Sequence, residues 1–395
     1  MLDEVSWAGR LGGDTFLTRT YHRSYAHILS TAGTADLFSW DDLNRIIATQ
    51  RLEPPRLRLS LDGEMVPLHR YAIPTTNRRA VSWSRIQPAE FHAQLRDGAS
   101  LVLDSVEKIH PAVGAAAEGL ERFLGTSVQA NAYASWTDRE GFGLHWDDHD
   151  VVVVQVHGSK RWRLYGSTRE APTFRDVESP ETPEGDPVAD IVLSPGDVLY
   201  LPRGWWHAVT ADQGTESLHL TFGMVPHTGA DLMIWVVDQL RSSLALRKDV
   251  PRFLPLAEQS DFIAALRGEV LNMMADPRLV ERWAESSDTT DLGHAIPSLP
   301  YVEGLPAQRG ITVKVTTARG RLTANGVHGT VTLSAAGTAW DFAESAEPAL
   351  SALLTGAPVT LGDMADCAGL EVKDVAELVS ALIEGHVVAV VGTAL

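Results

Sequence analysis

The chain has 395 residues, of which 44% are hydrophobic, and this length exceeds what one hydrophobic core usually covers, so we expect two or three domains. Its 51 acidic residues outnumber the 33 basic ones, and the net charge of -18 argues against direct nucleic-acid binding. The lone Cys367 excludes an internal disulfide framework and a cysteine-based zinc site.

The same charge would attract a basic protein or peptide through long-range steering, although acidity can also serve solubility alone. No uncharged apolar run approaches the roughly 18 residues of a membrane span. Residues 1–20 have neither the basic start nor the apolar core of a secretory signal. We therefore expect a cytoplasmic protein without membrane contact.

The first ninety or so residues mix helical and extended patterns. In SWDDLNRIIATQ, residues 39–50, Ser39 precedes two acids and predicts the start of a helix. RLRLSLDGEMVPL alternates with a period of two, which predicts a hairpin around Asp62-Gly63. We interpret this region as a lead-in to the domain that follows.

From Ser127 to Met224 the pattern changes to short extended segments separated by turn residues. Such spacing predicts a mainly β domain, either a sandwich or a barrel. The insertion STREAPTFRDVESPETPEGDP, residues 167–187, is rich in proline and acids, which predicts a surface loop.

Helical periodicity returns after Pro226. Phe262, Leu266, Val270 and Met273 recur at helix spacing, and such a stripe indicates core or a dimer interface. Residues 311–335 predict short strands, and the chain then continues through short helices and Gly385 into a final strand. We predict domains at 1–226, 227–304 and 305–395, the last of which resembles a winged helix.

Polar side chains precede the valine run of HWDDHDVVVVQVHGSK, residues 145–160. Side chains alternate across a strand, so His145 and Asp147 are predicted to share one face. A second segment, GDVLYLPRGWWHAVT, reads as a strand with one histidine after a Pro-x-Gly turn, and this histidine is His207. Two histidines and one carboxylate leave three positions open on an octahedral ion, as in non-heme Fe(II) oxygenases, and zinc fits this donor set less well.

His149 and Asp148 are rival ligands. Four positions along a strand span roughly 13 Å, which is too far for His145 and His149 to share one ion. We assign both rivals to a turn or to support of the true ligands.

Gly196, Pro202, Gly204 and His207 keep a spacing that resembles the second cupin motif, and HWD followed by Gly158 resembles the first. Together, HWDDHDVVVVQVHGSKRWRLYG and LPRGWWH resemble the JmjC-type cupin family of ribosomal oxygenases, which are Fe(II)- and 2-oxoglutarate-dependent protein hydroxylases. The resemblance implies a double-stranded β-helix (cupin or jelly-roll) catalytic domain, a helical dimerisation region and a winged-helix C-terminal domain.

The resemblance also assigns residues. It implies His145, Asp147 and His207 as the catalytic metal ligands and Lys160 as the cation that binds the distal carboxylate of 2-oxoglutarate. The remaining residues implied to line the cosubstrate pocket are Asn131, Tyr133, His219 and Thr221. Trp205 or Trp206 is a candidate wall of the substrate pocket, although aromatic packing explains them equally.

The implied activity uses Fe(II), 2-oxoglutarate and O2 to hydroxylate an aliphatic carbon, with His or Arg of a ribosomal protein as the first hypothesis and a homodimer as the expected assembly. Three alternatives remain. They are a hydroxylase of a natural-product precursor peptide, a non-enzymatic cupin and winged-helix regulator, and a cupin enzyme without cosubstrate, for which Lys160 would be dispensable.

Overall fold

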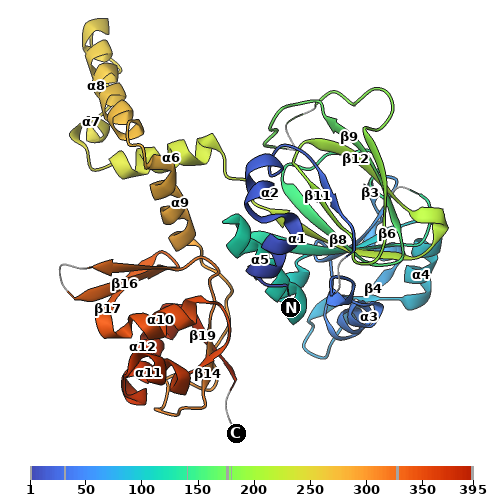
Figure 1. Ribbon diagram of the computed structural model, residues 1–395. Helices are drawn as coiled ribbons and strands as arrows, with labels where there is room; N and C mark the ends of the chain where they lie inside the picture. Colours follow the sequence, from blue (N-terminus) through green and yellow to red (C-terminus); the bar gives the residue numbers. More distant parts are fainter. Residues whose placement is uncertain are drawn as a thin grey trace. The chain divides into compact units, whose positions relative to one another are not determined.

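The computed structural model describes residues 2–30, 33–139, 141–174, 178, 180–325 and 329–392. The chain divides into two compact units, Met1–Pro226 and His227–Leu395 (Figure 1). Parts of two predicted segments, residues 175–177 and 179 of the insertion and residues 326–328, lie outside the described residues. No helix within the described ranges is long and apolar enough to cross a membrane.

The first unit combines helices with antiparallel strands. Its helices are α1 (Glu4–Leu11), α2 (Gly13–Arg19), α3 (Trp40–Thr49), α4 (Pro88–Arg96) and α5 (Pro111–Leu124). Its strands are β1 (Ala26–Ile28), β2 (Leu57–Leu61), β3 (Glu64–Met65), β4 (Ala72–Thr76), β5 (Ser82–Ile86), β6 (Ser100–Leu103), β7 (Val128–Ser135), β8 (Asp150–His157), β9 (Lys160–Ser167), β10 (Ala189–Leu193), β11 (Val198–Leu201), β12 (Trp205–Ala211) and β13 (Ser217–Met224). The predicted helix at Ser39, capped reciprocally by Asp42, and the β2–β3 hairpin are both confirmed.

The strands of this unit form one large sheet and two small ones. The eight-stranded sheet has the order β1-β11-β8-β13-β7-β6-β2-β3, and the smaller sheets are β10-β9-β12 and β4-β5. Val151 and Val153 of β8 pack in one cluster with Trp162 and Leu164 of β9. Val152, by contrast, packs in the main core with residues of α1, α2 and α5. The valine run is therefore unbroken because β8 is buried on both faces.

Two buried carboxylates complete the backbone hydrogen bonding of β7. Strand β6 pairs with Ala132–Ala134, and no other described strand pairs with the earlier residues of β7 on that side. Glu121 accepts a hydrogen bond from the amide of Val128 at 2.9 Å, and Glu107 accepts one from Ala130 at 2.9 Å. The two glutamates thus take the place of a strand at this position.

Gly158, in the turn between β8 and β9, requires the absence of a side chain. Its φ is +63°, and an added Cβ would lie 1.8 Å from the carbonyl oxygen of Glu216. This close approach allows the tight turn that brings Lys160 into β9 at its first residue.

The second unit begins with helices and ends in a small α+β arrangement. Its helices are α6 (Gly229–Leu240), α7 (Leu244–Arg247), α8 (Leu256–Met274), α9 (Leu279–Thr290), α10 (Glu347–Leu354), α11 (Leu361–Ala368) and α12 (Val372–Glu384). Its strands are β14 (Thr312–Val315), β15 (Arg321–Asn325), β16 (Thr330–Ala335), β17 (Thr338–Ala343), β18 (Val359–Thr360) and β19 (Val388–Gly392), in sheets ordered β18-β14-β19 and β15-β16-β17.

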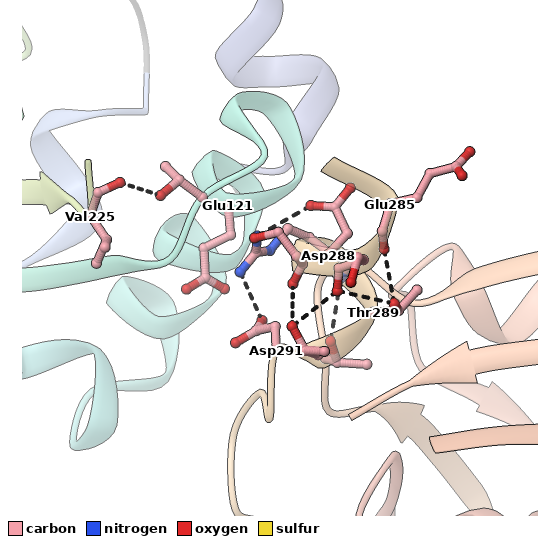
Figure 2. A network of polar contacts seen from close by, with 12 residues as sticks. Glu121, Val225, Glu285, Asp288, Thr289 and Asp291 are labelled. Carbon is pink, nitrogen blue, oxygen red and sulfur yellow. Dashed lines mark hydrogen bonds and ion pairs between the residues drawn. The ribbon is translucent and has the colours of Figure 1, made fainter. Parts of the chain in front are cut away.

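A network of ion pairs connects the end of α9 with Arg319 and Arg321, which lie just before and at the start of β15. The buried guanidinium of Arg319 lies 3.2 Å from Asp288 and 3.4 Å from Asp291, and Figure 2 shows both carboxylates turned toward one guanidinium group. Arg321 pairs with Asp288 at 2.8 Å as well. Because the arginine is buried between two acids, this end of α9 is held firmly against the following strands.

Candidate metal centre

Two segments far apart in sequence bring the predicted metal ligands together. His145, Asp147 and His207 each offer one ligand atom, and these atoms lie within 4.8 Å of one another. The Nε2 atom of His207 is 3.6 Å from Oδ2 of Asp147, and the two imidazole centroids are 4.3 Å apart. Such spacing suits side chains that converge on a single ion.

The prediction that a strand places His145 and Asp147 on one face is wrong, because neither residue lies in a strand. The structure places both in the loop before β8, where His145 forms an isolated bridge with His207. The two backbones exchange hydrogen bonds of 3.1 and 2.7 Å, and the amide of Gly204 donates to the carbonyl of Asp147 at 2.8 Å. Pairing with the start of β12, and not strand pleating, therefore directs the two side chains to one point.

Backbone carbonyls orient both ligand histidines. Nδ1 of His145 lies 2.9 Å from the carbonyl oxygen of Gly143, and Nδ1 of His207 lies 2.9 Å from that of Trp205. Donation from each Nδ1 fixes the tautomer in which Nε2 carries the coordinating lone pair. The donor set of two neutral imidazoles and one carboxylate fits Fe(II) or a similar divalent ion.

A buried aspartate holds the ligand loop to the turn before β12. Asp150 is 2% exposed and accepts hydrogen bonds from the Tyr200 hydroxyl, from the amide of Arg203 at 3.0 Å and from His22 Nδ1 at 2.9 Å. Its pKa is lowered, because these hydrogen bonds outweigh the effect of desolvation, which alone would raise it. Asp150 thereby joins the segments that carry Asp147 and His207.

Lys160 supplies a buried cation beside the proposed metal ligands. Only 4% of the residue is exposed, and its ammonium group donates a hydrogen bond to Ser135. Burial lowers the pKa of Lys160 to about 7. Within the described part of the chain, no carboxylate forms an ion pair with this ammonium group, so its environment favours an anionic ligand.

The ligands and Lys160 line one cavity of about 130 Å³. Its other lining residues are Arg58, Ser100, Tyr133, Gly141, Phe142, Gly143, Val151, Trp162, Val209, His219 and Thr221. Tyr133 and His219 stack with centroids 5.1 Å apart. Burial lowers the pKa of His219, with Lys160 adding to the effect, and burial raises the pKa of Tyr133 to about 12, so both rings are neutral near pH 7.

Other residues named from the sequence lie outside the cavity lining. Asn131 accepts a hydrogen bond from the amide of Ser105 at 3.0 Å, although it also hydrogen-bonds to Tyr133. Asp148 and His149 occupy the bend before β8 and contact each other at 3.1 Å.

The tryptophans before His207 pack elsewhere. Trp205 packs on Tyr25, and Trp206 donates to Thr168 at 2.9 Å. The tryptophan that lines the cavity is Trp162, which stacks on His207 with centroids 5.5 Å apart. Sequence reasoning missed Trp162 and Ser135, although each stands two positions from a residue that it named, on the same strand face.

A family model for the JmjC domain matches residues 108–232, a range that contains all three candidate metal ligands and Lys160. Two curated relatives are the "Bifunctional lysine-specific demethylase and histidyl-hydroxylase NO66" of Drosophila pseudoobscura pseudoobscura and "Ribosomal oxygenase 2" of Bos taurus. The first is 30% identical over 257 residues, covering 60% of this chain and 25% of that protein. The second is 33% identical over 166 residues, covering 40% of this chain and 36% of that protein.

The match to these curated relatives thus spans only about a quarter to a third of their length. Among solved structures, the ribosomal oxygenase YcfD from Escherichia coli in complex with cobalt and 2-oxoglutarate aligns with a TM-score of 0.60 at 18% identity, covering 96% of this chain and 98% of that chain. This likeness confirms the JmjC cupin-like fold, with its large antiparallel sheet and associated helices.

Proposed function

From the JmjC domain that the chain contains, we propose that this protein is an Fe(II)- and 2-oxoglutarate-dependent oxygenase that hydroxylates an aliphatic carbon of a protein side chain. One observation carries the proposal. A single cavity holds a divalent-ion donor set of two histidines and an aspartate together with a buried lysine that no described carboxylate neutralises. A cupin enzyme without an anionic cosubstrate would have no use for that lysine.

Different residues of the cavity would bind the metal and the cosubstrate. His145, Asp147 and His207 would hold Fe(II), which when bound supplies the redox chemistry that activates dioxygen. Lys160 would anchor the distal carboxylate of 2-oxoglutarate, with Ser135 keeping its ammonium group in place. The rings of Tyr133 and Trp162 line the same cavity and would exclude water from the reacting groups.

For the substrate we propose a His or Arg side chain of a ribosomal protein. The names of the relatives, histidyl-hydroxylase and ribosomal oxygenase, support this class. The net charge of -18 supports a basic protein as well, because opposite charge accelerates encounter.

We further propose that residues 227–304 form a dimerisation region and that residues 305–395 form a winged-helix domain. Helix α8 has no buried residue, and Leu256, Ile263 and Met274 on it are 82%, 58% and 46% exposed. These three positions are spaced by seven and eleven residues, so they lie along one side of the helix. A second copy of the chain would cover this apolar stripe.

The test is mass spectrometry on ribosomal proteins from a strain that lacks the gene, before and after incubation with purified enzyme, Fe(II), ascorbate and 2-oxoglutarate. A gain of one oxygen atom on one protein, absent with Asp147→Ala, is the expected result. Conversion of 2-oxoglutarate to succinate without a modified ribosomal protein would contradict the substrate and retain the oxygenase. No conversion would contradict the oxygenase itself.

A further inference from the structure

Two adjoining cavities lie in the first unit between α3, α4 and the β4–β5 hairpin. Figure 1 labels α3, α4 and the first strand of the hairpin, β4. Their volumes are about 520 and 370 Å³. They share four wall residues, Asn44, Ile47, Phe91 and His92, and therefore form one continuous depression, which we name the α3–α4 groove.

The α3–α4 groove is basic although the chain is acidic. None of the residues that line either cavity is Asp or Glu, whereas Arg51, Arg85 and Arg96 all line it. Among the described residues, no carboxylate forms an ion pair with these three guanidinium groups, whereas carboxylates do pair with the nearby Arg58 and Arg139. The groove therefore offers three arginines that have no ion-pair partner among the described residues, and the nearby carboxylate of Glu53 is engaged by the amide of Ser84, which also lines the groove.

Strand β5 and helix α4 each place basic side chains on the side that lines the groove. Trp83 and Arg85 are two residues apart on β5 and so share one face of the hairpin. His92 and Arg96 are four apart on α4 and share one side of that helix, whereas Glu90 points away from it.

Aromatic rings accompany the positive charge. The guanidinium of Arg51 lies 4.5 Å from the ring centroid of Trp83, and both residues line the groove. Trp40 and Trp136 line its second cavity and are partly exposed, with ring centroids 5.6 Å apart. At the tip of the hairpin, Arg78 and Arg79 are exposed and extend the basic surface beyond the groove.

We infer that the α3–α4 groove binds a segment of single-stranded RNA. A positively charged groove with aromatic rings on which bases stack is the usual design of a single-strand binding surface. Arginines would contact phosphates, and the rings of Trp83, Trp40 and Trp136 would accept bases. An acidic peptide would satisfy the arginines but would not require three indole rings beside them.

The net charge of the whole chain does not oppose this inference. Charges separated by more than about 8 Å at physiological ionic strength are largely screened, so a bound strand responds chiefly to the groove itself. The earlier expectation against nucleic-acid binding rests on the sum of charges, whereas the structure separates a local basic surface from the acidic remainder.

The experiment measures fluorescence anisotropy of a labelled single-stranded oligoribonucleotide titrated with the full-length protein at several salt concentrations. We expect saturable binding, with a log-log salt slope of about -0.7 for each phosphate contacted. Trp83→Ala should weaken binding about tenfold or more, and Trp83→Phe should retain most of it. Arg51→Glu with Arg85→Glu should weaken it further and reduce the slope by about 1.4.

The matched control is Arg19→Glu with Arg23→Glu, which makes the same change in charge on exposed residues outside the groove. It should leave the affinity nearly unchanged, and all variants should keep the circular dichroism spectrum and the metal affinity of the wild type, because none of these residues lines the metal cavity. Three results would each overturn the inference: no saturable RNA binding, equal loss in the control, or tighter binding of a polyglutamate peptide or of DNA of the same sequence.

Discussion

Lys160 and Ser135 are hydrogen-bonded to each other in the protein interior, where only 4% and 3% of their surfaces are exposed. A hydroxyl group offers the ammonium a dipole but no charge, so the protonated form of Lys160 has no ion-pair partner in the described part of the chain. The interaction therefore holds the side chain in place while leaving its charge for a ligand.

Lys160→Ala should raise the dissociation constant of 2-oxoglutarate by about a hundredfold or more, because losing one partner of a buried ion pair costs about 3 to 5 kcal/mol. Isothermal titration with the metal-loaded protein measures this constant. Arg161→Ala, on the same strand but paired with Asp190 and Asp212, is the matched control and should bind normally. An unchanged constant in Lys160→Ala would remove this residue from the site.

The affinity for 2-oxoglutarate should also depend on pH. Burial lowers the pKa of Lys160 to about 7, so above that pH the free protein holds mostly neutral amine and binding must take up a proton. The affinity should therefore fall by up to about tenfold for each pH unit above 7 and be constant below it. The Lys160→Arg side chain stays charged throughout this pH range, so its affinity for 2-oxoglutarate should not fall above pH 7. Calorimetric titrations in buffers of different ionisation enthalpy would then detect proton uptake in the wild type and none in the variant.

Asp147→Ala should abolish both metal retention and turnover, since it removes the anionic member of the donor set. Metal content after dialysis and succinate release are the two measurements. Asp148 is a neighbouring acid in the bend, and Asp148→Ala should retain both the metal and the release of succinate. Normal iron content in Asp147→Ala would contradict the assigned metal centre.

Asp150→Ala should weaken metal binding about 10- to 100-fold, although Asp150 is not among the three candidate ligands. The change leaves the buried Tyr200 hydroxyl and the Arg203 amide without their acceptor, and the free energy of unfolding should fall by about 3 kcal/mol. Urea denaturation and metal competition measure the two effects. A stability loss with unaltered metal affinity would show that Asp150 supports the fold without positioning the ligands.

The proposed dimer predicts that Ile263→Glu with Met274→Glu yields a monomer in light scattering, because charges would interrupt the apolar side of α8. Asn272→Glu, on the opposite side of this helix, should remain dimeric. A wild-type protein that is monomeric at micromolar concentration would contradict the dimer.

The residue types of the metal centre could be predicted from the sequence, but their geometry could not. Motif spacing named His145, Asp147 and His207 as candidate ligands, whereas the bridge between His145 and His207 joins residues 62 positions apart and depends on sheet assembly. Serine is common on strands, so only the pairing with Lys160 distinguishes Ser135.

The basic groove shows a second limit of sequence reasoning. More than thirty residues separate Arg51 from Arg85, and about ten separate Arg85 from Arg96. The net charge of the chain adds these arginines to all 51 acidic residues and so hides a local basic surface. Only the packing of α3, α4 and the β4–β5 hairpin brings them to one surface. Net charge affects the long-range encounter with a partner, whereas a bound ligand responds chiefly to the charges close to it.

The glutamates beside β7 also bear on aggregation. An uncovered row of amides is a template onto which a strand from another molecule can add. With the amides of Val128 and Ala130 already donated to Glu121 and Glu107, this stretch of β7 cannot recruit a foreign strand on that side. Replacing either carboxylate would leave one of these amides without its acceptor and would open this stretch of β7 to a strand from another molecule.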